Sequence, residues 1–264
     1  MKKVVFILAL MLTTSLTFAQ DAATPAPASK FAVAVDVVYP YLWRGLALNS
    51  LSKVAVQPYI SYAATSKLTL GVWGTTNLTN DATPNNESYN EFDWYVSYQI
   101  APVAKVMVSD YYASSPTTYR ARYFTYDKTS TQALDLSVLL NFSSKGVPLD
   151  FQWNTLVAGN DQKTDSSGDR NYSSYSEIGY TFAALAKGFD VRAFAGAVVS
   201  SSSYYVTDKF KFTNVGLNAS KSVKFSDSFS LPIFVRYAYN DNGNLNKVSE
   251  LKHNVISAGT TFNL

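Results

Sequence analysis

Apolar and polar side chains alternate along most of the chain beyond residue 30, in segments of about ten residues. The segment 91–100 is the clearest case, with Phe92, Trp94, Val96, Tyr98 and Ile100 on one face and Glu91, Asp93, Tyr95, Ser97 and Gln99 on the other. A period of two residues places successive side chains on opposite faces of a β-strand. The pattern therefore predicts an all-β chain whose strands each have one apolar face.

The alternation recurs in twelve segments, near 31–39, 53–62, 67–77, 91–100, 105–113, 131–142, 149–158, 172–182, 189–199, 210–220, 229–239 and 253–264. Short links near 63–66, 101–104, 143–148, 183–188 and 221–228 alternate with longer ones near 40–52, 78–90, 114–130, 159–171, 200–209 and 240–252. An even number of ten-residue strands with this loop asymmetry is typical of bacterial transmembrane barrels. We expect one closed antiparallel barrel over residues 31–264, with short periplasmic turns and longer extracellular loops.

Closure has a physical reason, because hydrocarbon offers no partner to an unpaired backbone N–H or C=O group. A soluble sandwich or lipocalin-like barrel is the alternative, and it would turn the aromatic rows inward and the polar rows toward water. The apolar face extends over twelve segments, which is more than the core of one small sheet could cover. The pattern favours the membrane barrel.

The first residues predict export. Lys2 and Lys3 precede an apolar run from Val4 to Leu12, and a more polar stretch ends at Ala19. This is the pattern of a secretory signal peptide, and we expect residues 1–19 to be cleaved off before Gln20. The apolar run is too short to span a bilayer as a helix, which takes about 20 apolar residues. Residues 20–30 are predicted to form a Pro/Ala-rich periplasmic tether.

Composition narrows the class of protein further. Without Lys2 and Lys3 the formal charge falls from +3 to about +1, which does not suit a nucleic-acid-binding surface. There is no cysteine, so disulfides and thiolate sites are excluded. The 19 Tyr, 16 Phe and 4 Trp suit strands, and the outward-facing ones are expected to anchor the barrel in outer-membrane lipid: Tyr62, Trp94, Tyr98, Tyr180 and Tyr237.

The last segment has a signal of its own. Ile256, Ala258, Thr260, Phe262 and Leu264 share one face, and the sequence stops at Leu264. This resembles the carboxy-terminal signal read by the barrel-assembly machinery, which we therefore expect as a partner. That signal usually ends in an aromatic residue, so Leu264 is a mild departure.

The first third of the chain carries a more specific resemblance. Its elements are Asp36-Val37-Val38-Tyr39, Tyr41-Leu42-Trp43-Arg44-Gly45, Ala55-Val56-Gln57-Pro58, Gly71-Val72-Trp73-Gly74 and Glu91-Phe92-Asp93-Trp94-Tyr95. Over residues 31–100 this resembles the TorF-type putative porin family, although Trp43 stands where that family commonly has Tyr or Phe. The resemblance implies an outer-membrane pore of unassigned substrate and brings no catalytic residues.

The inward faces are where function is expected. A barrel of about twelve strands exceeds the eight that side chains can fill but is smaller than open porins, so a narrow passage is predicted. Its wall would hold the candidate pore-lining residues Lys53, Glu91, Asp93, Lys105, Asp135, Glu177, Asp190, Arg192 and Arg236, together with Asp36, Asp150, Tyr59, Trp73 and Tyr95. Both signs of charge are present, which suits small polar solutes or ions. Alternatively, these charges pair with one another and rigidify the lumen.

Two further expectations concern arginines. Arg44 lies where the first strand meets the first long loop, so it either enters the pore at a constriction or caps aromatic rings at the membrane boundary. If Phe182 opposes Phe189, Arg192 faces Gly179 and is a diagonal neighbour of Glu177. We expect such a pair in a wet lumen to contribute no more than about 1 kcal/mol.

Two other function classes are alternatives to a channel. A barrel hydrolase would use the one histidine, His253, with Ser257 or Asn254. A structural, adhesive or assembly-accessory barrel is also compatible with the polar loops. The run Asn240–Asn244 resembles part of a calcium loop but lacks the closing glutamate, so no metal site and no cofactor are expected.

Overall fold

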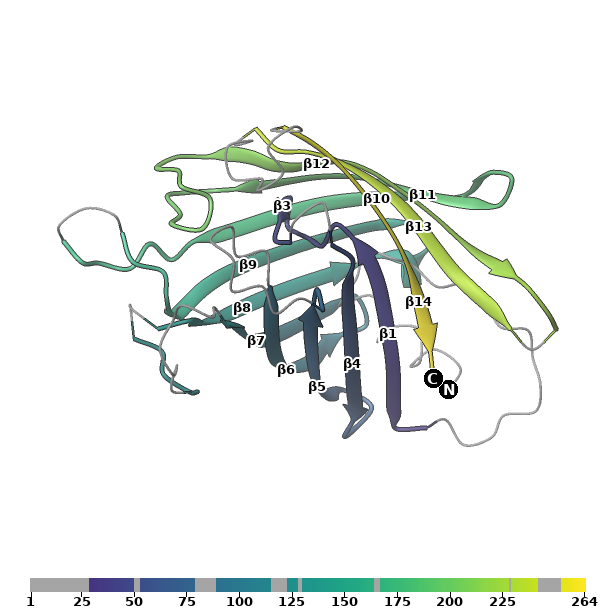
Figure 1. Ribbon diagram of the computed structural model, residues 1–264, viewed down its shortest axis with the longest axis horizontal. Coiled ribbons are helices and arrows are strands. Elements are labelled where there is room, and N and C mark those ends of the chain that lie inside the picture. The colour runs from purple at the N-terminus through teal and green to yellow at the C-terminus, as the bar shows by residue number, and fades with distance from the viewer. Residues whose placement is uncertain are drawn as a thin grey trace.

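The computed structural model describes residues 29–49, 53–78, 89–114, 123–127, 130–163, 167–227, 229–241 and 253–264. Twelve strands close into one antiparallel barrel, which confirms the predicted fold class (Figure 1). They are β1 (Phe31–Tyr39), β4 (Ala55–Ala63), β5 (Leu68–Thr76), β6 (Asn90–Ala101), β7 (Ala104–Ser114), β8 (Gln132–Asn141), β9 (Leu149–Gly159), β10 (Ser174–Ala186), β11 (Phe189–Val198), β12 (Lys211–Lys224), β13 (Ser230–Tyr239) and β14 (Asn254–Asn263). The predicted signal peptide and residues 20–28 of the tether lie outside the described residues, as does 242–244 of the loop fragment.

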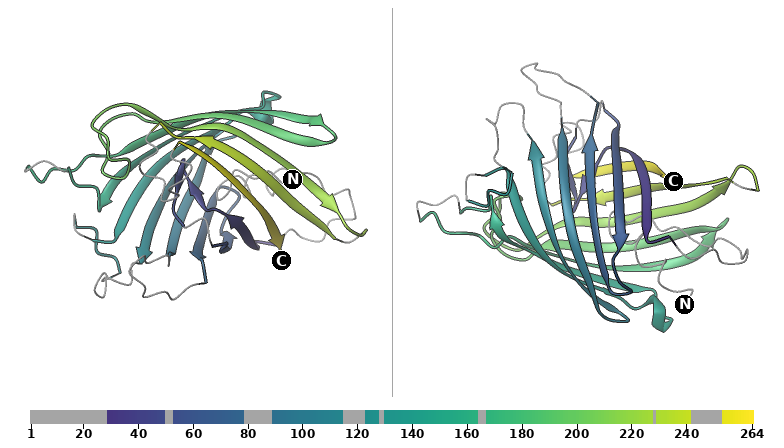
Figure 2. Two further views of the ribbon diagram at one scale, coloured as in Figure 1. Left: turned by 45° about the horizontal axis from the view of Figure 1, so that its top comes forward. Right: turned by 90° about the horizontal axis from the view of Figure 1, so that it is seen from below.

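Each barrel strand pairs with its neighbours in sequence, and β1 closes the ring by pairing with both β4 and β14. Val37, for example, lies opposite Val56 on one side and Thr260 on the other. The first and last strands therefore run side by side, and the C-terminus lies at the end of the barrel that carries the short turns (Figure 2). We refer to this as the short-turn end and to the other as the long-loop end.

Two short strands stand outside the barrel sheet. They are β2 (Leu42–Trp43) and β3 (Leu46–Ala47), which form a small hairpin in the connection from β1 to β4. A single turn of 3-10 helix, η2 (Ser143–Lys145), lies in the short turn before β9. No helix in the described part of the chain is long and apolar enough to cross a membrane.

The strand faces follow the predicted alternation. Outward-facing side chains around the barrel are large, apolar and exposed, among them Ile60, Val72, Tyr98, Leu136, Ile178, Tyr180, Val235, Tyr237 and Ile256. Inward-facing side chains are mostly polar and buried, among them Asp36, Gln57, Asp93, Asp135, Asn154, Glu177, Arg192, Asn218 and Ser257. This arrangement is the reverse of a water-soluble barrel, in which apolar side chains fill the interior.

The predicted register of β10 and β11 is wrong by two residues. Arg192 lies opposite Thr181, and Phe182 opposes Val191 rather than Phe189. The cause is an irregularity between Phe182 and Ala186, followed by a tight turn that pairs Ala186 with Phe189. The strands therefore extend beyond the predicted link 183–188, and β12 likewise continues to Lys224 rather than ending near 220.

Candidate functional site

The hairpin of residues 42–47, here called the inner hairpin, folds into the barrel. Arg44 and Gly45 form its tip, with φ of 47° and 86°. Two successive residues with positive φ form the tight turn that suits a two-residue hairpin loop. A Cβ atom on Gly45 would lie 1.7 Å from the carbonyl oxygen of Thr213, so a glycine is needed for the tip to approach β12.

Hydrogen bonds from several elements hold the inner hairpin and its stem. Asn240 donates to the carbonyl of Gly45 at 3.0 Å. Tyr205, from the connection between β11 and β12, donates to the carbonyl of Arg44 at 3.0 Å. Ser257 of β14 donates to the carbonyl of Pro40 at 2.7 Å. The hairpin is thus fixed to the barrel wall by side chains far apart in sequence.

Arg44 reaches across the interior from the tip of the inner hairpin. Its Nη1 lies 2.9 Å from Oδ2 of Asp135 on β8, and its Nη2 donates to the hydroxyl of Tyr111 on β7 at 3.1 Å. The guanidinium also lies 4.7 Å from the ring centre of Trp43 and 5.5 Å from that of Tyr175. Burial lowers the pKa of Arg44 and Asp135 raises it, with a net upward shift, so the group stays charged. Arg44 therefore lies inside the barrel rather than at the membrane boundary, and its place at a constriction of a pore stays a prediction.

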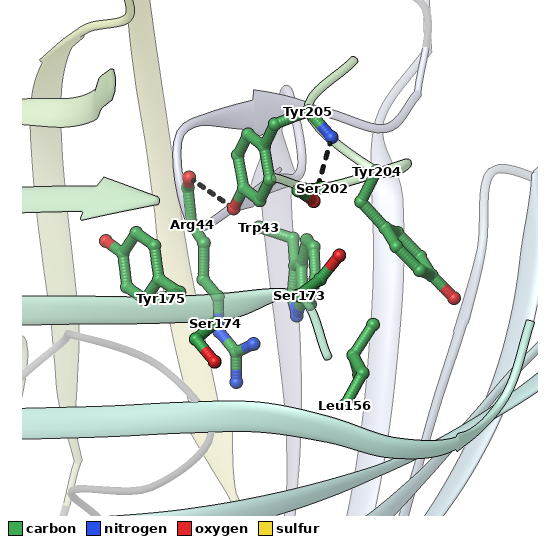
Figure 3. A pocket seen from close by; sticks show the side chains of 9 residues that line it. All are labelled: Trp43, Arg44, Leu156, Ser173, Ser174, Tyr175, Ser202, Tyr204 and Tyr205. Carbon is green, nitrogen blue, oxygen red and sulfur yellow. Dashed lines mark hydrogen bonds between the residues drawn. The ribbon is translucent and has the colours of Figure 1, made fainter. Parts of the chain in front are cut away.

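A small pocket lies beside the inner hairpin, toward the long-loop end (Figure 3). Arg44 and Leu156 contribute to its lining. The other lining residues carry aromatic rings or hydroxyl groups: Trp43, Ser173, Ser174, Tyr175, Ser202, Tyr204 and Tyr205. Figure 3 shows Tyr205 bonded to Arg44 and Ser202. Burial, followed by the nearby Asp161, raises the pKa of Tyr204.

Asp161 ties together the two loops behind this pocket. Its carboxylate accepts the backbone N–H of Ser173 at 2.8 Å, the hydroxyl of Ser173 at 2.6 Å and the hydroxyl of Ser203 at 3.1 Å. Burial raises the pKa of Asp161, while these hydrogen bonds lower it. The loop after β9 and the loop after β11 are thereby joined beside the inner hairpin.

A second charged cluster lies on β9, β10 and β11. Arg192 binds the carboxylate of Asp150 with two nitrogens, Nε at 2.9 Å and Nη2, and Nη2 also lies 2.9 Å from Oε1 of Glu177. A Cβ atom on Gly179 would lie 2.2 Å from Nη2 of Arg192, so the glycine leaves the space that the guanidinium crosses. Arg192 and Glu177 form an ion pair, but the prediction that they are diagonal neighbours is wrong, because Arg192 lies opposite Thr181.

The cluster continues to β12 and β13 through Glu177. The hydroxyl of Tyr175 and the amide of Asn214 both donate to Oε2 of Glu177, at 2.5 and 2.6 Å. Arg236 donates to Oδ1 of Asn214 at 3.0 Å. The Phe194 ring has the Arg236 guanidinium 4.6 Å and the Arg192 guanidinium 5.5 Å from its centre. These strands therefore present two arginines to the interior.

The opposite wall is acidic. Oε2 of Glu91 accepts the hydroxyls of Tyr89 at 3.0 Å and Tyr41 at 3.4 Å. Asp93 accepts the backbone N–H of Tyr112 at 3.1 Å. Asp36 accepts the hydroxyl of Thr261 at 2.6 Å. Among the described residues, no lysine or arginine forms an ion pair with any of these three carboxylates.

The remaining predicted residues do not form a further cluster. Lys105 on β7 is buried, as is Arg236 of the second cluster. Asp190 is half-buried near the short-turn end and accepts the backbone N–H of Ala184 at 2.8 Å. Lys53 is half-buried just before β4, where its carbonyl accepts the amide of Asn49.

Sequence reasoning missed several partners of the site. Tyr111, Tyr175 and Asn214 lie on inward faces, so strand alternation could have found them. Tyr205 and Asn240 come from connections without a period, and no sequence signal marks them. No group of three or more His, Cys, Asp or Glu side chains suited to a metal ion occurs in the described ranges.

The three residues of the hydrolase alternative have separate partners. The hydroxyl of Ser257 donates to Pro40, and the amide oxygen of Asn254 accepts the hydroxyl of Tyr237. His253 lies with Nδ1 2.9 Å from the carbonyl oxygen of Asn240, and its ring stacks on that of Tyr239. The geometry gives this alternative no catalytic constellation.

Together, the fold and the interior define a closed twelve-stranded barrel with a charged interior that the inner hairpin enters. A bacterial family described as "Bacterial protein of unknown function (Gcw_chp)" matches residues 22–105. A solved structure described as "NanC porin structure in rhombohedral crystal form" superposes with a TM-score of 0.46 and 11% identity, covering 88% of this chain and 98% of that one. No curated protein matches the chain. The TorF-type resemblance is not confirmed by these matches and stays a prediction.

Proposed function

We propose that this protein is a porin-like channel of the bacterial outer membrane, through which small polar solutes or ions diffuse along a narrow lumen. The observation that carries the proposal is the pairing of an exposed apolar exterior with a buried polar, charged interior. Such a barrel cannot be stable in water with its aromatic rows exposed, but it suits a lipid environment. The signal peptide predicted over residues 1–19 and the C-terminal strand support export and assembly by the barrel-assembly machinery.

The inner hairpin is the constriction in this proposal. It occupies the interior between β1, β8 and β12, with Arg44 against Asp135 and Gly45 against Thr213. A passage on either side of it would be lined by both signs of charge. We therefore expect a low conductance and weak selectivity rather than the large, open current of a wide barrel.

Planar-bilayer recording of the refolded protein tests the proposal, with a matched variant in which residues 42–47 are replaced by a Gly-Ser linker of equal length. We expect small, discrete openings for the natural protein and a several-fold larger conductance for the variant. Co-fractionation with the outer membrane, and faster gel migration before boiling than after it, are expected of both. Silence of both proteins in the bilayer would overturn the channel.

The close fit of the inner hairpin favours a second candidate, a structural or adhesive barrel that does not conduct. In that case the linker variant alone would conduct. The same recordings therefore separate the two functions, because a natural channel must carry current with its hairpin in place.

A further inference from the structure

The acidic wall is a connected surface on the inner faces of β1, β4, β5 and β6, and we define it by Asp36, Tyr59, Trp73, Glu91 and Asp93. Paired and hydrogen-bonded residues connect β1 to β6 without a gap. Asp36 pairs with Gln57, Gln57 donates to Thr75, and Thr75 pairs with Glu91. One step along the barrel, Trp73 pairs with Tyr59 on one side and with Asp93 on the other. Three carboxylates thus surround two aromatic rings.

Within the part of the chain that the structure describes, these carboxylates have no positively charged partner. Asp36 is 0% exposed, and its Oδ2 has no hydrogen-bond partner. Glu91 and Asp93 are 9% and 8% exposed, and their hydrogen bonds come from tyrosine hydroxyls and one backbone N–H. A buried charge without a partner costs several kcal/mol, so such a group is normally paired, binds a cation or takes up a proton, and a cation is the partner that a solute can supply. The wall is therefore complementary to a positive ligand.

Aromatic rings accompany the carboxylates. The ring centres of Tyr41 and Trp73 are 5.5 Å apart, and those of Tyr41 and Tyr89 are 6.1 Å apart. The faces of such rings attract ammonium groups, particularly where water is excluded. Tyr41 directly precedes the inner hairpin, and its hydroxyl donates a hydrogen bond to the carboxylate of Glu91. An arriving ammonium group would compete with that hydroxyl for the same carboxylate.

The spacing of the charges decides what kind of cation fits. Neighbouring strands lie about 4.8 Å apart, so the three strand steps from Asp36 to Glu91 span roughly 14 Å along the wall. One metal ion cannot bind groups so far apart, whereas a chain with separated amino groups can. We infer that the acidic wall binds an organic cation with amino groups spaced along an alkyl chain, such as a polyamine. The inference rests on the proposed channel, and it names the class of solute that the channel prefers.

Current block in bilayers tests the inference with four probes of matched size or charge: spermidine, 1,4-diaminobutane, 1,4-butanediol and Mg²⁺. We expect block by spermidine at the lowest concentration, then by 1,4-diaminobutane, and none by the neutral diol. A charge-assisted hydrogen bond contributes roughly 1.5–3 kcal/mol, so the double variant Glu91→Gln, Asp93→Asn should weaken block about ten- to hundredfold. The control is Asp227→Asn, which removes an exposed carboxylate in a short turn. This variant should be blocked by each probe at the same concentration as the natural protein.

The outcomes separate the inference from the channel itself. Equal block by Mg²⁺ and 1,4-diaminobutane, or unchanged block in the double variant, would show plain charge screening and overturn the site. If the protein is silent in bilayers, the channel fails, and binding is measured instead as a spermidine-dependent thermal shift of the detergent-solubilised barrel. A shift that the double variant loses would support the site without the channel, and no shift would overturn it. Trp73→Leu should reduce the response in either assay, which a purely electrostatic wall would not show.

Discussion

Arg44 and Asp135 lie 91 positions apart in the sequence and form an ion pair of 2.9 Å across the barrel interior. Their side chains are 12% and 0% exposed. Among the described strands, the two strands of the inner hairpin pair with each other and form a sheet separate from the barrel. Side-chain contacts of this kind therefore help to determine where the hairpin lies. In the proposed channel, this ion pair would help to set the position of the hairpin.

We predict strong coupling between these two side chains. In a double-mutant cycle with Arg44→Ala and Asp135→Asn, the interaction free energy should be about 1–3 kcal/mol, as for contacting groups in one network. Each single variant leaves a buried group without its partner, so each should unfold at lower urea concentration in lipid vesicles. Independent, additive effects would show that another contact holds the hairpin.

Gly45 offers a second prediction with a matched control. Gly45→Ala places a Cβ atom 1.7 Å from Thr213 O at a residue with φ of 86°. Gly146 has the same type of backbone, with φ of 79°, but no atom lies within 4 Å of an added Cβ. Gly146→Ala is therefore the control. In both variants, the left-handed conformation of the alanine should lower the free energy of unfolding by about 1 kcal/mol.

The Gly45 variant alone should also displace the hairpin tip. We expect its conductance to rise toward that of the linker variant, while Gly146→Ala conducts like the natural protein. Equal conductance of the two alanine variants would mean that the tip does not limit the passage.

The strands and their faces could be predicted because lipid outside and polar groups inside impose a two-residue period on every strand. Asp93 and Trp94, for example, lie on the faces that alternation assigns to them. The same rule placed Glu177 and Arg192 on one inner wall even though the register was wrong. Register depends on turns and bulges, and the irregularity near Ala184, with φ of 49°, has no marker such as glycine.

Loop packing could be predicted only as a choice between alternatives, or not at all, because connections have no period. The inner hairpin is one case. Asp110 of β7 is another case, because it is 0% exposed. Its carboxylate accepts the hydroxyl of Tyr123, which lies in a connection, and the amide of Gln132. A loop segment that folds back against its own barrel is determined by tertiary contacts, which a one-dimensional pattern does not contain.

Export makes a prediction that is independent of the barrel interior. Amino-terminal sequencing of the protein recovered from outer membranes should begin at Gln20 or within about two residues of it, because the small-residue cleavage site ends at Ala19. Replacing Ala19 by a bulky residue should slow processing and leave a larger precursor. Recovery of the membrane form with Met1 intact would contradict the predicted signal peptide.

The last prediction concerns the contribution of Arg192 to the free energy of unfolding. The structure makes the expected contribution larger than the sequence alone suggests. In a wet lumen the pair with Glu177 would contribute no more than about 1 kcal/mol. Arg192 is instead 5% exposed and binds both Asp150 and Glu177. Removing one partner of a buried ion pair leaves an uncompensated charge, so Arg192→Ala should lower the free energy of unfolding by about 3 kcal/mol.

The matched control is Lys224→Ala, which breaks the exposed pair with Asp227 and should leave the unfolding midpoint unchanged. Folded Arg192→Ala protein should also show a greater cation preference, because Glu177 and Asp150 then face the lumen without their positive partner. Screening weakens with falling salt, so the shift in reversal potential should grow at low ionic strength. An Arg192→Ala barrel with natural stability and an unchanged reversal potential at low salt would place Arg192 outside both the folding core and the conducting path.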